Sequence, residues 1–199
     1  MTTPHDGLSI CVYCGSRPGI DPIHLEAARV VGHWIGARGA QLVYGGGRTG
    51  LMGAVADAAK EAGARVVGVI PQALVDKELA NGACDELHVV STMHERKAMM
   101  GERAGAFLAL AGGIGTFEEL FEIWTWRQLG YHDKPIGILN TARYFDRLLA
   151  FLDQSVQDGF MNPWQMGLVR TDDQVDALCA WLARHAGPTQ PPGTLADRI

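Results

Sequence analysis

The chain has 199 residues, of which 47% are hydrophobic and 20% charged, and its formal net charge is −5 at pH 7. This length predicts one domain with a substantial buried core. The acidic balance gives no sign of a nucleic-acid-binding face or a polybasic membrane patch, and no apolar run approaches the roughly 20 residues that span a bilayer. Residues 1–7 lack a basic segment followed by an apolar one, so we expect no signal peptide and a cytoplasmic protein.

Short apolar segments rich in β-branched residues alternate along the chain with longer segments of helical periodicity. Strands are expected at 8–14, 40–44, 65–70, 86–90, 106–110 and 135–139, with a short seventh near 168–169. Helices are expected at 22–38, 50–61, 93–103, 116–129, 143–157 and 173–184. The alternation predicts an α/β fold, a single Rossmann-like doubly wound domain whose parallel sheet of about six to seven strands is flanked by helices.

The ends of the chain differ in composition from the segment between them. We expect an N-terminal tail at 1–7, a Rossmann-like nucleotide-hydrolase domain at 8–186 and a flexible C-terminal tail at 187–199. The last segment is predicted to be flexible because Pro and Gly are frequent in it.

The cysteines and histidines carry no sign of metal or redox chemistry. Cys11 and Cys14 form a C-x-x-C pattern, but they lie in a predicted strand, where residues three apart point to opposite faces. That arrangement is poor for a disulfide, so we interpret both as small core residues. The seven histidines have no metal-ligand spacing. We therefore expect neither a metal nor a cofactor.

Three glycine-rich segments follow predicted strands and are expected at one edge of the sheet. They lie at 14–19, 44–50 and 112–116. Ligands of doubly wound sheets bind beyond the carboxyl ends of the strands, so these segments are candidates for a binding site. None has the P-loop pattern, and the first strand lacks the dinucleotide-binding fingerprint. The pattern favours a site for one phosphate.

The segment 109–119 is the most informative part of the sequence, because a strand, a glycine-rich turn and a helix start follow one another there. Glycines let a ligand approach the backbone closely, and free N–H groups at a helix N-terminus attract anions. Thr116 and Glu119 also fit a capping box, T-x-x-E, in which Glu119 bonds to the backbone of the N-cap residue. The residues thus leave two interpretations of Glu119 open, a helix cap and a functional carboxylate.

A charged segment at 93–100 begins at the same predicted edge of the sheet. A solvated face of an amphipathic helix explains its charges, and so does a contact between Arg96 and either the anion or Glu119. An adjacent arginine lowers the pKa of a carboxyl and keeps it ionised. A phosphate anchor, an ionised carboxylate and a cation fit hydrolysis of an N-glycosidic bond, whose transition state carries positive charge on the sugar.

These motifs resemble those of the LONELY GUY family, cytokinin riboside 5′-monophosphate phosphoribohydrolases that are often mislabelled lysine decarboxylases. The turn at 112–119 is similar to the family signature P-G-G-x-G-T-x-x-E, and 93–98 is similar to M-H-x-R-K-A. Further similarity extends the resemblance over roughly residues 8 to 175. Ala111 stands where the signature has Pro, which fixes φ, and we expect this departure to tune the loop without loss of activity.

The resemblance implies hydrolysis of purine ribonucleoside 5′-monophosphates, AMP and N6-prenylated AMP, to free base and ribose 5-phosphate, with catalysis by Arg96 and Glu119. It implies substrate contacts from Ser16, Glu78, Arg96, Lys97, Gly113, Ile114, Gly115, Thr116, Phe117, Glu118, Glu119 and Thr125. The family is typically dimeric, with some hexameric members, so we expect a homodimer. Trp124 and Trp126 are candidates for either an interface or the core.

Two other functions stay open at this point. A pyridoxal-dependent decarboxylase needs a Schiff-base lysine, and the chain offers Lys60, Lys77, Lys97 and Lys134. A non-catalytic nucleotide-binding or carrier protein of the same fold shares the glycine-rich turns but does not need Arg96 and Glu119 together.

Overall fold

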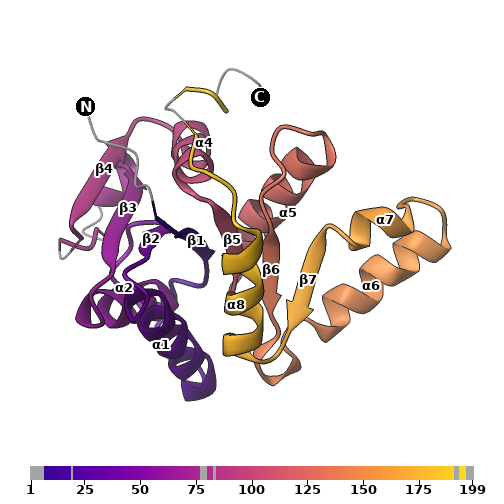
Figure 1. Ribbon diagram of the computed structural model, residues 1–199, viewed down its shortest axis with the longest axis horizontal. Helices are drawn as coiled ribbons and strands as arrows, with labels where there is room; N and C mark the ends of the chain where they lie inside the picture. The colour runs from indigo at the N-terminus through magenta and orange to yellow at the C-terminus, as the bar shows by residue number, and fades with distance from the viewer. Residues whose placement is uncertain (1–6, 19, 77–79, 83, 191–192, 196–199) are drawn as a thin grey trace.

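The computed structural model describes residues 7–18, 20–76, 80–82, 84–190 and 193–195. Seven parallel strands form one sheet with helices on both faces (Figure 1). The strands are β1 (Ser9–Tyr13), β2 (Gln41–Tyr44), β3 (Arg65–Pro71), β4 (Glu86–Val90), β5 (Ala106–Ala109), β6 (Ile136–Leu139) and β7 (Val169–Asp172). The helices are α1 (Pro22–Gly36), α2 (Gly50–Glu61), α3 (Gln72–Val75), α4 (Met93–Arg103), α5 (Ile114–Gln128), the 3-10 turn η1 (Thr141–Arg143), α6 (Asp146–Gln157), α7 (Pro163–Met166) and α8 (Val175–His185).

This architecture confirms the predicted α/β fold with a parallel sheet, and most elements fall within two residues of their expected bounds. The predicted helix at 143–157 is divided, because residues 141–143 form η1 and α6 begins only at Asp146. Helices α3 and α7 were not predicted, since a helix of four residues is too short to show periodicity.

The strand order β4-β3-β2-β1-β5-β6-β7 places the candidate site. Strands β2, β3 and β4 follow one another on one side of β1. The chain then crosses to β5, which pairs with the other side of β1. The connections after β1 and β5 therefore lead to helices on opposite faces, and a crevice opens between them at the carboxyl edge.

Alternate residues of β1 belong to two separate cores. Ile10, Val12 and Cys14 belong to the cluster that contains residues of α1, α2 and α8. Cys11 and Tyr13 belong to the cluster that contains residues of α4 and α5. This confirms that the two cysteines point to opposite faces, and burial raises the pKa of both thiols well above the usual range. Among the described residues, no group of three or more His, Cys, Asp or Glu side chains is arranged to hold a metal ion.

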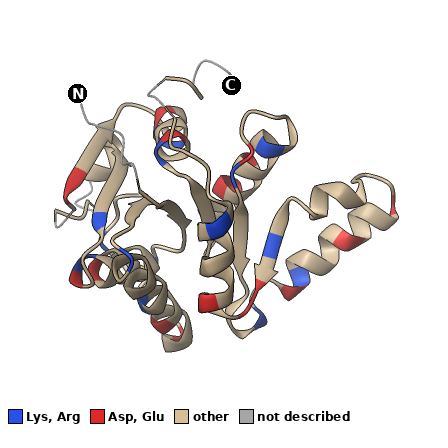
Figure 2. Ribbon diagram, in the orientation of Figure 1, with Lys and Arg blue, Asp and Glu red and all other residues tan. Residues whose placement is uncertain are grey.

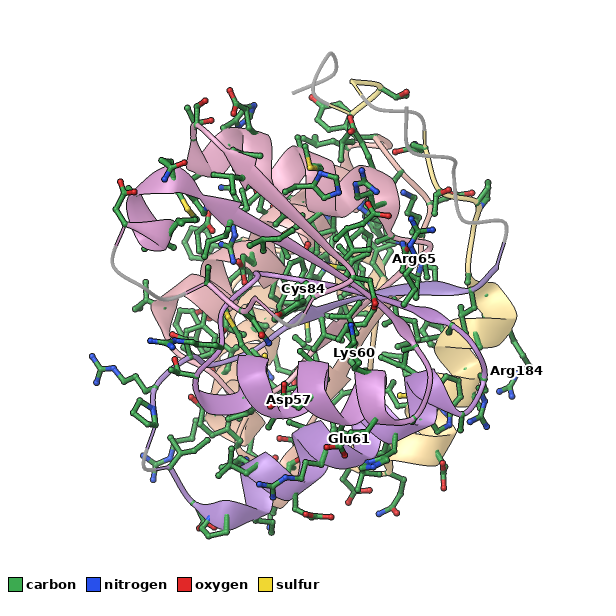
Figure 3. The ribbon with its side chains drawn as sticks, turned by 90° about the vertical axis from the view of Figure 1, so that its left-hand side faces the viewer. Asp57, Lys60, Glu61, Arg65, Cys84 and Arg184 are labelled. Atoms are coloured by element: carbon green, nitrogen blue, oxygen red, sulfur yellow. The ribbon has the colours of Figure 1, made fainter. Side chains whose placement is uncertain are left out.

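Helices α1 and α2 approach each other closely because α1 has glycine where they meet. A Cβ on Gly32 would lie 2.5 Å from the carbonyl oxygen of Val55, and one on Gly36 would lie 2.4 Å from Cβ of Ala62. Figure 3 looks onto α2, and its labelled residues Asp57, Lys60 and Glu61 form the exposed polar side of that helix. The opposite side of α2 is apolar and buried.

The described part of the segment after α8 packs against the domain, unlike the flexible tail expected at 187–199. The N–H of Gly187 bonds to the carbonyl of Gly105 at 3.0 Å, and the N–H of Gln190 bonds to the carbonyl of Glu102 at 2.7 Å. Leu195 is buried, and its N–H bonds to the Glu102 carboxylate at 3.0 Å. These tertiary contacts outweigh the Pro- and Gly-rich composition.

Charged residues of both signs are interspersed over the described elements rather than gathered on one face in the view of Figure 2. Among the described residues, no helix combines the length and the apolarity that a membrane span requires.

Gly32→Ala is expected to destabilise the fold by about 1–3 kcal/mol, because the new methyl group overlaps the α2 backbone. Alanine is otherwise about 1 kcal/mol more favourable than glycine in a helix. The variant is less stable only if the steric cost exceeds this gain. Urea unfolding followed by circular dichroism measures the change. Gly115→Ala is the control, because a Cβ there meets no described atom within 4 Å. Equal stability of Gly32→Ala and the wild type would contradict the packing.

Candidate active site

A cavity of about 1040 Å³ opens at the carboxyl edge of the sheet, at the crossover between β1 and β5. The loops that follow β1, β2 and β5 form much of its wall, and all three carry the glycine-rich segments predicted to meet there. Other wall residues come from β3, α1, α3 and the turn before α6. The three segments are therefore brought together as expected.

The N-terminus of α5 faces this cavity with unpaired backbone donors. Gly113 is the N-cap residue, and its carbonyl accepts the N–H of Phe117 at 3.0 Å. The N–H groups of Ile114, Gly115 and Thr116 precede the first intrahelical donor, so they have no acceptor within the helix. A Cβ on Gly113 or Gly115 would meet no described atom within 4 Å. The backbone is thus open to an anion at this point.

Two other helices that begin near the cavity, α1 and α2, have N–H groups of their first turn occupied. The carbonyl of Gly15 accepts the N–H groups of Leu51 and Met52 in α2, at 2.9 and 3.3 Å. The carboxylate of Asp21 accepts the N–H of Ile23 in α1 at 3.0 Å. Of these three helices, α5 is therefore the one whose first N–H groups are open toward the cavity.

The capping box, one of the two interpretations that Thr116 and Glu119 allow, does not form. The helix begins at Ile114, so Thr116 is its third residue and Glu119 lies in its second turn. Thr116 is buried against the glycine-rich turn, where a Cβ on Gly112 would lie 2.1 Å from its Oγ1. Because Glu119 is not needed as a cap, its carboxylate is available for another contact.

That contact is a buried ion pair with Arg96, which lies in the first turn of α4. Nη1 of Arg96 donates to Oε1 of Glu119 at 2.8 Å, and the two residues are only 5% and 4% exposed. Nε of Arg96 donates to the carbonyl of Val69 at 3.1 Å, and Nη2 to that of Gly45 at 3.4 Å. Both members of the pair line the cavity. Three acceptors therefore hold the guanidinium beneath the α5 N-terminus.

The segment at 44–50 has glycine at position 45 because Arg96 occupies the space that a side chain would need there. A Cβ at this position would lie 2.1 Å from Nη2 of Arg96. Since Arg96 is held by three acceptors, it cannot move away without loss of the ion pair. Glycine is therefore required for the Arg96 side chain to reach Glu119.

Burial raises the pKa of the Glu119 carboxyl to about 7, against the Arg96 guanidinium, which lowers that pKa. Negative charge on the adjacent Glu118 raises the pKa further. Arg96 thus lowers the pKa of Glu119 as expected, but the loss of solvation raises that pKa by more. A carboxyl with a pKa near 7 gains and loses its proton at physiological pH, as an acid–base catalyst requires.

The predicted site residues divide into those that line the cavity and those that do not. The first group is Ser16, Arg96, Gly113, Ile114, Gly115, Thr116 and Glu119. Lys97 forms ion pairs with Glu118 and, at 2.9 Å, with Glu122 on the outer side of α4 and α5. Phe117 contacts Phe145 (ring centroids 6.3 Å apart), and the Thr125 hydroxyl donates to the carbonyl of Phe121 at 2.7 Å. Glu78 lies outside the described residues.

Several lining residues carried no signal in the sequence. Ile70, Leu74 and Met52 look like core residues, and His24 lies in an ordinary helical pattern. Tyr144 lies within the part of the chain that resembles the family, but nothing in its spacing indicates a contact with the turn at Gly112.

Comparisons with known proteins identify the family of this chain. A family model described as "Possible lysine decarboxylase" matches residues 52–182. Cytokinin riboside 5'-monophosphate phosphoribohydrolase LOG2 of Arabidopsis thaliana is 48% identical over 77% of this chain and 72% of its own length. LOG3 of the same plant, also a cytokinin riboside 5'-monophosphate phosphoribohydrolase, is 47% identical over 89% of this chain and 82% of its own length.

The chain belongs to the cytokinin riboside 5′-monophosphate phosphoribohydrolase, or LONELY GUY, family. Its members include a probable enzyme of this type from Oryza sativa subsp. japonica, LOGL1, which is 49% identical over 76% of this chain and 68% of its own length. Among solved structures, a molybdenum cofactor carrier protein from Chlamydomonas reinhardtii has the same fold, with a TM-score of 0.68 and 22% identity. The alignment covers 89% of this chain and 97% of that protein.

The decarboxylase description of the family model finds no support in the described lysines. Lys60 is bonded to Asp85 at 2.8 Å, and Lys97 is paired with two glutamates. Lys134 is buried next to β6, where its Nζ donates to the carbonyl of Gly101 at 2.8 Å. None of these three lines the cavity, so none is placed to form a Schiff base there. Lys77 lies outside the described residues.

The free energy of unfolding of the wild type is expected to fall as pH rises from about 4.5 to about 7, relative to Glu119→Gln. In this window the folded chain keeps the Glu119 proton and the unfolded chain has lost it, so deprotonation opposes folding. The maximal slope for one such group is about 1.4 kcal/mol per pH unit. Urea unfolding of both proteins at pH 5, 6 and 7 measures the difference, and parallel curves would contradict the raised pKa.

Proposed function

We propose that this protein hydrolyses the N-glycosidic bond of purine ribonucleoside 5′-monophosphates, AMP and its N6-prenylated form, to release the free base and ribose 5-phosphate. The observation that carries the proposal is the buried Arg96–Glu119 pair beside an open helix N-terminus in one cavity. The family to which the chain belongs supports the same activity. Release of a cytokinin from its nucleotide is then the biological reaction.

The proposed nucleotide lies with its phosphate at the start of α5. The free N–H groups of Ile114, Gly115 and Thr116 bind phosphate oxygens, and the helix dipole favours the negative charge. Glu119 follows Ile114 by five residues, which is about 7.5 Å along a helix axis. One helix thus holds the phosphate and sets the distance from it to the carboxylate.

In the proposed mechanism the bond between C1′ of the ribose and the base nitrogen breaks as positive charge develops on the sugar. The ionised Glu119 stabilises that charge and orients a water molecule toward C1′. The water oxygen bonds to C1′ and one of its protons passes to Glu119. Glu119 then gives this proton up to the departing base nitrogen, which leaves the carboxylate ionised again. Arg96 holds the Glu119 carboxylate in place and favours its ionised form.

A non-catalytic carrier is the alternative that the glycine-rich turns alone would allow. Such a protein needs a binding cavity, but it gains nothing from a carboxylate whose pKa lies near 7 or from a buried arginine that holds it. Burying an ion pair costs several kcal/mol of desolvation for each ion. The presence of the pair therefore favours hydrolysis.

We further propose that the protein acts in the cytoplasm as a homodimer. Trp124 and Trp126 are buried within the chain, so the interface must use other residues. Phe151 in α6, Phe160 in the following turn and Trp164 in α7 are all exposed, and Phe160 is 87% exposed. Exposed aromatic groups of this kind mark contact surfaces. These elements project at the side of the molecule furthest from β4 (Figure 1).

Purified protein is expected to release adenine from AMP and N6-isopentenyladenine from the prenylated nucleotide, as resolved by chromatography. The rate should rise with pH through about 7, because the ionised carboxylate is the active form. Glu119→Gln should lower kcat by about 10²- to 10⁴-fold. Gly115→Ala should raise KM for AMP at least about tenfold, because the methyl group occupies space proposed for the phosphate.

Glu122→Gln is the matched control, since its carboxylate lies on the same helix but outside the cavity. It should hydrolyse AMP nearly as fast as the wild type. Binding of AMP without release of base would favour the carrier, and full activity of Glu119→Gln would exclude the mechanism.

Size-exclusion chromatography with light scattering is expected to give twice the mass of one chain. Phe160→Ser should shift the population toward monomer, because it removes the most exposed aromatic side chain of the proposed surface. A wild type that stays monomeric at high concentration would contradict the dimer.

A further inference from the structure

Tyr144 makes a direct contact with the glycine-rich turn that precedes α5. It follows η1 at the edge of the cavity, and its hydroxyl donates a hydrogen bond to the carbonyl oxygen of Gly112. Gly112 is joined to Gly113, the N-cap residue of α5. In a planar trans peptide the C=O and N–H point in opposite directions, so fixing the Gly112 carbonyl also fixes the Gly113 N–H. Tyr144 therefore sets the orientation of the peptide that leads into α5.

The turn that carries Tyr144 has an unusual backbone. Ala142 and Arg143 have φ values of 51° and 61°, in the left-handed region. That conformation costs an L-residue about 1–2 kcal/mol and persists only where surrounding contacts impose it. Asn140 supplies two of these contacts, because its side chain donates to Asp146 at 2.8 Å and accepts the N–H of Phe145 at 2.7 Å.

Two further aromatic contacts hold the turn against its neighbours. The ring of Phe145 meets that of Phe117 in the first turn of α5 at 71°, with centroids 6.3 Å apart. The ring of Tyr144 meets that of His24 in α1 at 77°, with centroids 5.5 Å apart. The turn after β6 thus contacts the segment that leads into α5 through the Tyr144 hydroxyl group. It contacts the first turn of α5 through the buried ring of Phe145.

We propose that Tyr144 is a positioning residue for the phosphate of the substrate. It holds the Gly112–Gly113 peptide so that the free N–H groups at the start of α5 face the cavity. This inference rests on the proposed function, because it assigns the phosphate to α5. Among the interactions of the described residues, Tyr144 contacts neither Arg96 nor Glu119, so its hydroxyl acts on phosphate affinity and leaves bond cleavage unchanged.

Tyr144→Phe removes the hydroxyl and keeps the ring. The side chain is partly exposed, and the variant is expected to melt near the wild-type temperature. Loss of one hydrogen bond corresponds to about 0.5–1.5 kcal/mol, so KM for AMP should rise about 2- to 10-fold while kcat stays within about twofold. The dissociation constant of ribose 5-phosphate, measured by titration calorimetry, should rise by the same factor. Hydrolysis of adenosine, which has no phosphate, should not change.

Tyr131→Phe is the matched control, because it removes a tyrosine hydroxyl beyond the C-terminal end of α5, outside the cavity lining. It should leave both constants at their wild-type values. Unchanged KM and ribose 5-phosphate affinity in Tyr144→Phe would overturn the inference, and so would a fall in kcat at constant KM or an equal loss on AMP and adenosine. A wild type that releases no base contradicts the proposed function, whereas ribose 5-phosphate titration still tests Tyr144.

Discussion

The candidate site depends on one buried ion pair, between Arg96 of α4 and Glu119 of α5. Two charges removed from water are stable only when further hydrogen bonds satisfy them. Arg96 finds those bonds at the carbonyls of Val69 and Gly45, so the guanidinium joins β3, the loop after β2 and α5. These contacts exist only because β3, β2, β1 and β5 are consecutive neighbours in the sheet. The pair therefore requires this strand order.

The same constraint determines where glycine is needed. Gly45 leaves room for Arg96, and Gly112 leaves room for Thr116 in the turn before α5. Gly50 has a φ of 61°, and a Cβ there would lie 2.6 Å from the backbone of Ser16. In each case another part of the cavity wall occupies the place of a side chain. The glycine-rich segments serve the geometry of the wall as well as access for a ligand.

The sequence predicts those features that depend on local periodicity, and it fails where distant residues decide. The strands, the major helices and the meeting of three glycine-rich segments follow from alternation and strand order. The direction of Glu119 does not, because T-x-x-E fits a cap, whereas the helix begins two residues earlier, after Gly113. Only Arg96, 23 positions away, shows where the carboxylate points. Tyr144 was missed because its position depends on the left-handed backbone at Ala142 and Arg143. Neither residue is a glycine, which would have indicated such a backbone in the sequence.

This site differs from a cavity that only binds a ligand because α4 and α5 contribute different groups to it. Helix α5 supplies both the open N–H groups and a carboxylate at a fixed separation, so in the proposed mechanism binding and chemistry share one rigid element. Without the positive charges of α4, the same burial would raise the pKa of this carboxyl further and favour its protonated form. Arg96 offsets part of the burial, and the resulting pKa of about 7 makes the ionised form available. In the proposed mechanism, a fold shared with a carrier protein at a TM-score of 0.68 supports hydrolysis because one residue of α4 is placed against one residue of α5.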